Sequence, residues 1–186
     1  MEAMVAAQRM TAEEYLLLPE QPMTNLVEGE VVVAQPLALH QAVARDLFLA
    51  LHQWVSAGAQ RGEVTFPLEV NLDDHNVYAP DVLWYREGRG PGRSEVRPQP
   101  LPDLAVEVRS PSTWRYDIGL KKAAYERHGL PELWLVDTAA DEVISFRSAS
   151  SPAAGFDAGV ELARADTLSS PLLPGFALAL EALFPR

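Results

Sequence analysis

Two carboxylates stand within apolar, strand-like segments of the sequence. Asp81 is followed by the apolar run 82–85, and Glu107 lies inside the apolar run 104–108. Strand interiors disfavour aspartate, and an ionised carboxylate is rarely buried without a partner. Two such acids at one sheet edge could hold Mg²⁺, an ion that prefers oxygen ligands and usually retains several waters. The alternative is that each carboxylate points to solvent from an alternating strand.

A second group of polar residues follows a four-residue spacing. Asp117, Lys121 and Tyr125 would share one face of a helix, because residues four apart are neighbours on a helical surface. That face could present a cation to the two acids. The alternative is an ordinary aspartate–lysine helix pair, which stabilises an isolated helix by about 0.2–0.5 kcal/mol.

Several other kinds of site are excluded or unsupported. The sequence has no cysteine, so disulfides, thiolate metal sites and cysteine nucleophiles are excluded. It shows neither a Gly-x-Ser-x-Gly elbow nor a phosphate-binding glycine loop, which leaves serine hydrolases and nucleotide-binding folds without support. We expect the scattered histidines to be surface or core polar residues, because no two have metal-binding spacing: His40, His52, His75 and His128.

The charge of the chain argues against a general affinity for duplex DNA. The net charge is −11, whereas non-specific duplex binding depends mainly on cations that neutralise phosphates. Because local field steers a phosphate chain, a group of arginines could still form a basic surface. The loop 86–97 is the candidate DNA contact, with a solvated flexible loop as the alternative. The arginines concerned are Arg86, Arg89, Arg93, Arg97, Arg109 and Arg115.

The length and composition are those of one folded domain. The chain has 186 residues, of which 48% are hydrophobic, and we expect a single domain over 1–186. The longest apolar stretch, 173–183, is interrupted and shorter than the roughly 18 residues that a membrane helix requires. The first residues lack the basic and apolar regions of a secretory signal. These features predict a cytoplasmic protein without a membrane partner.

Local patterns in the first half predict the elements that would position the first acid. A capping box opens a short helix over 11–18, and either a hairpin or a strand with a tight bend is expected over 26–33. Apolar residues at spacings of three and four predict a helix over 40–55. An alternating strand over 68–72, a turn and the apolar run 77–85 predict a hairpin that carries Asp81 on its return strand.

The second half would position the other acid and the lysine. Its elements alternate in a way that is typical of a mixed α/β or α+β domain. The helix that carries Lys121 is expected to end at Gly129, where a left-handed residue is favoured. In order, the sequence predicts a strand over 104–108, a helix over 114–128, strands over 132–137 and 142–147, a loop over 149–159 and a helix over 178–184.

Taken in their order and spacing, several sequence blocks resemble the Uma-two family of restriction-endonuclease-like proteins. The resemblance extends from about residue 10 to the end of the chain. It implies the PD-(D/E)XK nuclease fold, in which a central mixed sheet is flanked by helices. The blocks are Leu26-Val27-Glu28-Gly29-Glu30, His40, Ala79-Pro80-Asp81-Val82, residues 102–113, residues 117–125, residues 129–137 and Leu172-Leu173-Pro174-Gly175-Phe176.

The resemblance also implies a site and an activity. Asp81 and Glu107 match the acids that bind a divalent metal, Mg²⁺ or Mn²⁺, in this superfamily. Arg109 stands where the motif usually has its lysine, which points to Lys121 on the following helix as the third catalytic residue. Asn25 stands where the family has an acidic residue, with Glu28 nearby.

The implied function is a metal-dependent endonuclease that hydrolyses phosphodiester bonds of DNA. Nucleases that cut both strands often pair, so the resemblance suggests a homodimer. The alternative is a catalytically inactive binding or regulatory module on the same fold.

Overall fold

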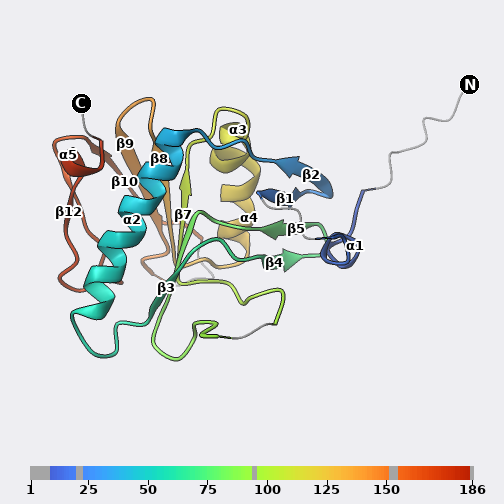
Figure 1. Ribbon diagram of the computed structural model, residues 1–186, viewed down its shortest axis with the longest axis horizontal. Coiled ribbons are helices and arrows are strands. Elements are labelled where there is room, and N and C mark those ends of the chain that lie inside the picture. Colours follow the sequence, from blue (N-terminus) through green and yellow to red (C-terminus); the bar gives the residue numbers. More distant parts are fainter. Residues whose placement is uncertain (1–8, 20–22, 94–95, 151–154, 185–186) are drawn as a thin grey trace, which may run out of the picture.

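A six-stranded mixed sheet forms the centre of the molecule (Figure 1). The computed structural model describes residues 9–19, 23–93, 96–150 and 155–184. Strands β7 and β8 run parallel, and the other neighbours in this sheet run antiparallel. In spatial order the strands are β10 (Ala158–Ala163), β9 (Glu142–Arg147), β8 (Glu132–Asp137), β7 (Leu104–Val108), β6 (Val82–Tyr85) and β3 (Glu63–Thr65).

One long helix covers the first face of this sheet. Helix α2 (Ala38–Ser56) buries Val43, Leu47 and Leu51 against strand residues that include Val106. These apolar positions recur at intervals of four, so they form one stripe along the helix. Within the ranges that the structure describes, no helix combines the length and apolar character that a membrane crossing needs.

A helical crossover between β7 and β8 covers the second face. It consists of α3 (Trp114–Tyr116), the π-helix η1 (Asp117–Lys121) and α4 (Lys122–Arg127). Parallel neighbours need such a crossover because a tight turn cannot join them. On this face Tyr125 packs with Leu133 of β8, and Gly129 has the expected positive φ of 74° just beyond α4.

The alternation of β7 decides which way Glu107 points. Val106 and Val108 belong to the cluster beneath α2, whereas Ala105 packs with the residues beneath α4. Successive strand side chains point to opposite faces, so Glu107 lies on the same side as Ala105. The whole strand is buried, and its acid therefore faces the crossover and not solvent.

A smaller, four-stranded sheet lies beside the central one (Figure 1). The expected hairpin turns at Gly29, where φ is 79° and an added Cβ would come within 2.6 Å of Arg9 Cβ. The capping box at Thr11 opens α1 (Ala12–Leu16) as expected. The strands, in spatial order, are β2 (Glu30–Val33), β1 (Thr24–Val27), β5 (Asn76–Tyr78) and β4 (Val70–Asp73).

The structure confirms the expected hairpin as β4 and β5, but its return strand is shorter than expected and does not carry Asp81. The apolar run 77–85 is not one strand, because it divides at Ala79-Pro80-Asp81 into β5 of the small sheet and β6 of the central sheet. Proline cannot donate to a strand ladder, which explains the break. Asp81 consequently lies at the junction between the two sheets.

The C-terminal part contains strands that the sequence did not predict. Strand β10 begins at Ala158, within the expected loop, and pairs with β9 over six residues. The expected C-terminal helix is shorter, with β12 (Leu178–Ala179) preceding α5 (Leu180–Leu183). Strand β12 pairs with β11 (Thr167–Leu168). Residues 151–154 of the expected loop lie outside the described residues.

Candidate active site

Asp81 and Glu107 come together where β6 meets β7. The first residue of β6, Val82, pairs with Val106, so Asp81 lies beside Glu107. The backbone of β7 fixes the position of Asp81. The Val108 amide donates to its Oδ2 at 2.7 Å, and the Asp81 amide donates to the Val106 carbonyl at 2.9 Å. Two carboxylates that are far apart in sequence thus share one place in the fold.

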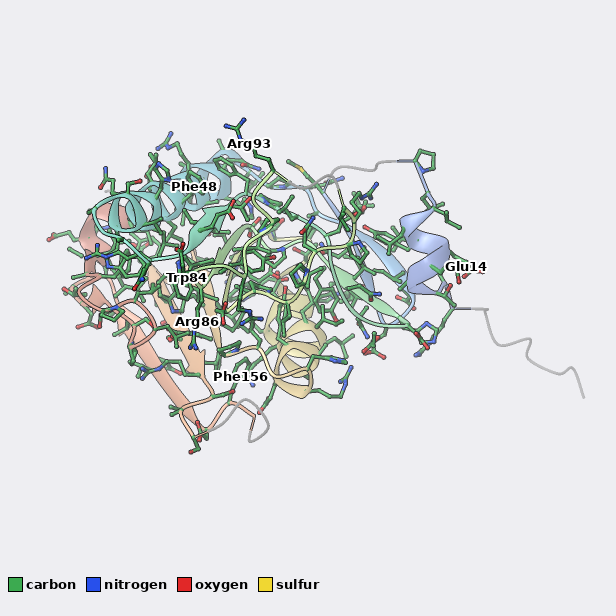
Figure 2. All side chains as sticks on the ribbon, turned by 90° about the horizontal axis from the view of Figure 1, so that it is seen from below. Glu14, Phe48, Trp84, Arg86, Arg93 and Phe156 are labelled. Carbon is green, nitrogen blue, oxygen red and sulfur yellow. The ribbon has the colours of Figure 1, made fainter. Side chains whose placement is uncertain are left out.

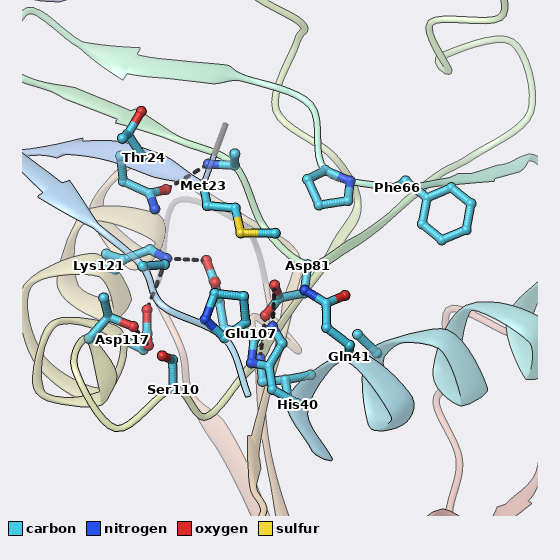
Figure 3. Close-up of a pocket in the computed structure, with 18 of the residues that line it drawn as sticks. Met23, Thr24, His40, Gln41, Phe66, Asp81, Glu107, Ser110, Asp117 and Lys121 are labelled. Atoms are coloured by element: carbon cyan, nitrogen blue, oxygen red, sulfur yellow. Dashed lines mark hydrogen bonds and ion pairs between the residues drawn. The ribbon is translucent and has the colours of Figure 1, made fainter. Parts of the chain in front are cut away.

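Lys121 joins this site from the crossover (Figure 3). Its Nζ lies 2.7 Å from Oε1 of Glu107 and 2.9 Å from Oδ1 of Asp117. The Tyr125 hydroxyl donates to the same Glu107 oxygen at 2.8 Å. Glu107 therefore does lie opposite the helix face that was predicted from the spacing of Asp117, Lys121 and Tyr125. All four side chains are buried, so this is not an ordinary surface helix pair.

The helix around Lys121 departs locally from α geometry. Asp117 and Lys121 are the first and last residues of the π-helical turn η1. Single π turns occur mostly inside α-helices and are frequent at functional sites. The sequence spacing alone predicts an α-helix, so this feature was not anticipated.

Burial and neighbouring charges shift the pKa values of both Glu107 and Lys121. Burial raises the pKa of Glu107, and the charges of Asp117 and Asp81 act in the same direction, while Lys121 opposes them. Burial alone would lower the pKa of Lys121, but the carboxylates of Asp117 and Glu107 outweigh it and raise that pKa above its usual value. Lys121 is therefore a permanent cation at neutral pH.

His40 is a residue that the sequence interpretation missed. Its Nε2 lies 3.0 Å from Oδ1 of Asp81, and its Nδ1 lies 3.3 Å from the carbonyl oxygen of Arg109. An ionised carboxylate and a carbonyl only accept hydrogen bonds, so both contacts are satisfied when the ring is protonated. Burial would lower the pKa of His40, but the hydrogen bond and charge of Asp81 raise it overall. The sequence did contain one signal for this residue, because His40 is among the blocks that resemble the Uma-two family.

These groups line a single cavity of about 290 Å³ (Figure 3). Asp81, Glu107 and Lys121 all line it, and so does Asn25, whose Oδ1 accepts from the Ala79 amide at 2.8 Å. The rest of the lining mixes apolar residues with polar and charged ones. The apolar residues include Met23, Ala34, Pro36, Ala44, Phe66 and Pro67, and the polar ones include Thr24, Gln41, Arg45, Ser110, Thr113 and Asp117.

The donor set of the cavity fits Mg²⁺ or Mn²⁺. These ions are usually held by one or two carboxylates, with water completing the coordination. Asp81 and Glu107 provide two carboxylates on the same cavity wall. Among the described residues, no group of three or more histidine, aspartate or glutamate side chains could hold a metal by itself. The protein thus offers a two-carboxylate site and not a complete cage.

Two other residues of the resembling blocks lie outside the cavity. Arg109 does not line the cavity, and its Nη1 instead contacts both oxygens of Asp137 at 2.8 and 2.9 Å. It therefore does not take the position of the motif lysine. Glu28 lies on the turn after β1, where Arg9 and Arg127 are both 3.9 Å from its carboxylate.

The arginines that were expected to form a basic surface are largely engaged with acids. Arg86 and Arg89 both contact the buried carboxylate of Asp103, and Arg97 contacts Glu69. Arg93 points outward from the loop (Figure 2). The expectation that the loop 86–97 contacts DNA stays a prediction, with most of its arginine charge already paired.

Comparison with known proteins identifies the family. Residues 12–181 match the model of the Uma2 (Uma-two) family, described as "Putative restriction endonuclease". The chain is similar to a crystal structure, at 1.96 Å resolution, of a "putative nuclease belonging to DUF820" from Anabaena variabilis ATCC 29413. The two share 18% sequence identity and a TM-score of 0.78, over 94% of this chain and 97% of that chain. No curated protein matches the chain. The chain belongs to the Uma2 family and has the restriction-endonuclease-like fold.

Proposed function

We propose that this protein is a metal-dependent nuclease that hydrolyses phosphodiester bonds of DNA. The observation that carries the proposal is the convergence of Asp81, Glu107 and Lys121 on one cavity. Each comes from a different segment, and buried charges are costly unless they are paired or bind a ligand. The family description and the nuclease fold support the same reaction class.

Each residue would have a distinct task. Asp81 and Glu107 would hold Mg²⁺ or Mn²⁺. Both partners of Glu107 contact Oε1, and this favours Oε2 as its metal-binding atom. When bound, the metal supplies a water of lowered pKa and neutralises phosphate charge. Lys121 would donate hydrogen bonds to the nucleophile or the phosphate, and Asp117 keeps it protonated, so it does not serve as a base.

A second candidate function is a nuclease-fold module that binds DNA without cutting it. The observation that favours this candidate is the ion pair between Lys121 and Glu107, because the ammonium competes with a metal for that carboxylate. Only the nuclease would cleave DNA in the presence of Mg²⁺ or Mn²⁺, so an assay of cleavage distinguishes the two candidate functions.

A cleavage assay in the presence of Mg²⁺ or Mn²⁺ tests the proposal. The substrates are end-labelled DNA in single-stranded and duplex form. We expect the Asp81→Asn and Glu107→Gln variants to lose at least about 100-fold in rate, since each removes charge that stabilises the transition state. Matched controls are Asp74→Asn and Glu30→Gln, which change exposed acids outside the cavity. Absence of metal-dependent cleavage by the wild-type protein on both substrates would contradict the proposal and favour the non-cutting module.

A further inference from the structure

We propose that the substrate is unpaired DNA, with one base stacked on Phe66 at the mouth of the cavity. The inference rests on the proposed nuclease function, because it concerns the strand that the same site would cut. It is carried by an aromatic stack beside the cavity, by the small volume of the cavity and by the distribution of arginine charge.

The aromatic stack ends in an exposed ring. Phe66 follows β3 and packs face to face on Phe48 of α2, with ring centres 3.9 Å apart and planes inclined by 14°. Phe48 in turn stacks on His52, with ring centres 5.8 Å apart. Phe66 is nevertheless 56% exposed and lines the cavity (Figure 3). An unpaired base could extend this stack on the cavity side.

The exposed part of the Phe66 ring offers a flat apolar surface to a ligand of the cavity. A large apolar side chain gains most by burial, and Phe66 keeps more than half of its surface in water. Stacking of an unpaired base on an aromatic ring contributes about 1–3 kcal/mol and does not depend on sequence, because every base has a flat face. Phe66 lines the same cavity as Asp81 and Glu107, so a nucleotide with its phosphate in the cavity could place a base on this ring.

The shape of the cavity favours a single strand. Its volume of about 290 Å³ lies at the small end of the range of roughly 300–1,000 Å³ that is typical of ligand pockets. Glu107 and Lys121 are each only 3–4% exposed, so a phosphate must enter the cavity to reach them. An unpaired nucleotide can turn into such a space, whereas pairing and stacking hold a duplex nucleotide outside it.

The charge distribution points in the same direction. Duplex affinity grows with the number of phosphates that lysine and arginine neutralise. At the cavity, Arg45 pairs with Asp46 and Lys121 pairs with two acids, while Arg86 and Arg89 are paired with Asp103. Aromatic stacking provides affinity without additional cations, which suits a chain of net charge −11.

A binding measurement that does not depend on cleavage tests the inference. One labelled oligonucleotide, single-stranded or annealed as a blunt duplex, is titrated with protein and followed by fluorescence anisotropy. The titration is made with Ca²⁺, which also takes oxygen ligands, and without divalent metal. A 2-aminopurine base in the strand reports stacking by fluorescence quenching. The variants are Phe66→Ala and Phe66→Trp, with Val160→Ala as an exposed apolar control on β10.

We expect the wild-type protein to bind the single strand at least ten-fold more tightly than the duplex. Phe66→Ala should weaken single-strand binding by about 5- to 100-fold and abolish the quenching, whereas Phe66→Trp and Val160→Ala should retain both. Equal or tighter duplex binding, unchanged binding by Phe66→Ala, or no binding of the single strand would overturn the inference.

Two further outcomes keep this inference separate from the proposed function. Single-strand binding that depends on Phe66 without any metal-dependent cleavage would retain the inference and contradict the nuclease. Cleavage without preference for unpaired DNA would retain the nuclease and overturn the inference. Sedimentation measurements on the same variants test whether Phe66 is contacted by a second copy of the chain and not by a base. If Phe66→Ala changed the oligomeric state and left DNA binding unchanged, the ring would belong to an interface between copies and the inference would fall.

Discussion

Replacing Lys121 with methionine should destabilise the protein strongly and in a pH-dependent way. Lys121 is 3% exposed and is the common partner of two carboxylates, at 2.7 Å from Glu107 and 2.9 Å from Asp117. Methionine retains most of the side-chain volume but removes the charge. Removing one partner of a buried ion pair usually costs about 3–5 kcal/mol, because it leaves an uncompensated buried charge.

The pH dependence of this loss has a definite sign. Burial and the charges of Asp117 and Asp81 raise the pKa of Glu107, and once Lys121 no longer opposes them the pKa of Glu107 rises further. A carboxyl whose pKa is raised by folding destabilises the native state as the pH rises above the unfolded value. The full loss is therefore expected near pH 8, and much of it should disappear near pH 5 as Glu107 takes up a proton.

Urea unfolding of the wild-type and Lys121→Met proteins at pH 5 and pH 8 measures both effects. Lys122→Met is the matched control, because Lys122 is partly exposed and its ion pair with Glu126 is 3.4 Å long. Lys122 also makes cation–π contacts with Phe146 and Phe156. We expect the control to lose about 1 kcal/mol or less, since partly exposed ion pairs and such cation–π contacts are weak. A loss below about 1 kcal/mol for Lys121→Met at pH 8, or the same loss at both pH values, would refute the reasoning.

Three further predictions concern residues at and beyond the site. Burial opposes ionisation of Asp73, but hydrogen bonds from His75, Asn76, His128 and Arg127 hold its pKa at about 2. Urea unfolding should show that Asp73→Asn lowers the free energy of unfolding by about 1–2 kcal/mol at pH 7. This difference from wild type should shrink as the pH falls from about 4 towards 2. A difference that does not depend on pH would contradict the prediction. Burial raises the pKa of Glu132 and outweighs both the hydrogen bonds that its carboxylate accepts from Trp134, Ser145 and Ser170 and the charge of Arg147. The wild-type protein should therefore lose stability relative to Glu132→Gln as the pH rises from 5 to 8, and thermal unfolding that showed the opposite trend would exclude this account. His40→Ala should reduce cleavage about 10- to 100-fold by releasing Asp81, whereas Gln53→Ala, at an exposed position of the same helix, should not. Equal rates for the two variants in the cleavage assay would remove the role of His40.

The fold was largely predictable where local chemistry agrees with tertiary structure. The capping box at Thr11, the turn at Gly29 and the left-handed Gly129 each mark an element boundary that the structure confirms. The strand that carries Glu107 was predicted with its residue bounds unchanged. In these cases the residue types themselves restrict the backbone.

The features that were missed depend on long-range contacts. Pairing with β9 makes β10 a strand, although its sequence contains small and polar residues. His40 carries no local signal of its contact with Asp81, which is 41 residues away in sequence. The arginines from 86 to 97 suggested a free basic surface, because the sequence does not show that Asp103 is buried beside two of them.

The central claim is that Asp81 and Glu107 form a metal centre, and calorimetric titration of Mn²⁺ tests it most directly. The wild-type protein and the exposed-acid control Asp74→Asn should bind Mn²⁺ with the same affinity. The Asp81→Asn and Glu107→Gln variants should bind it at least about ten-fold more weakly, since each loses one of two carboxylate ligands. Absence of Mn²⁺ binding by the wild-type protein, or undiminished binding by both variants, would contradict the account.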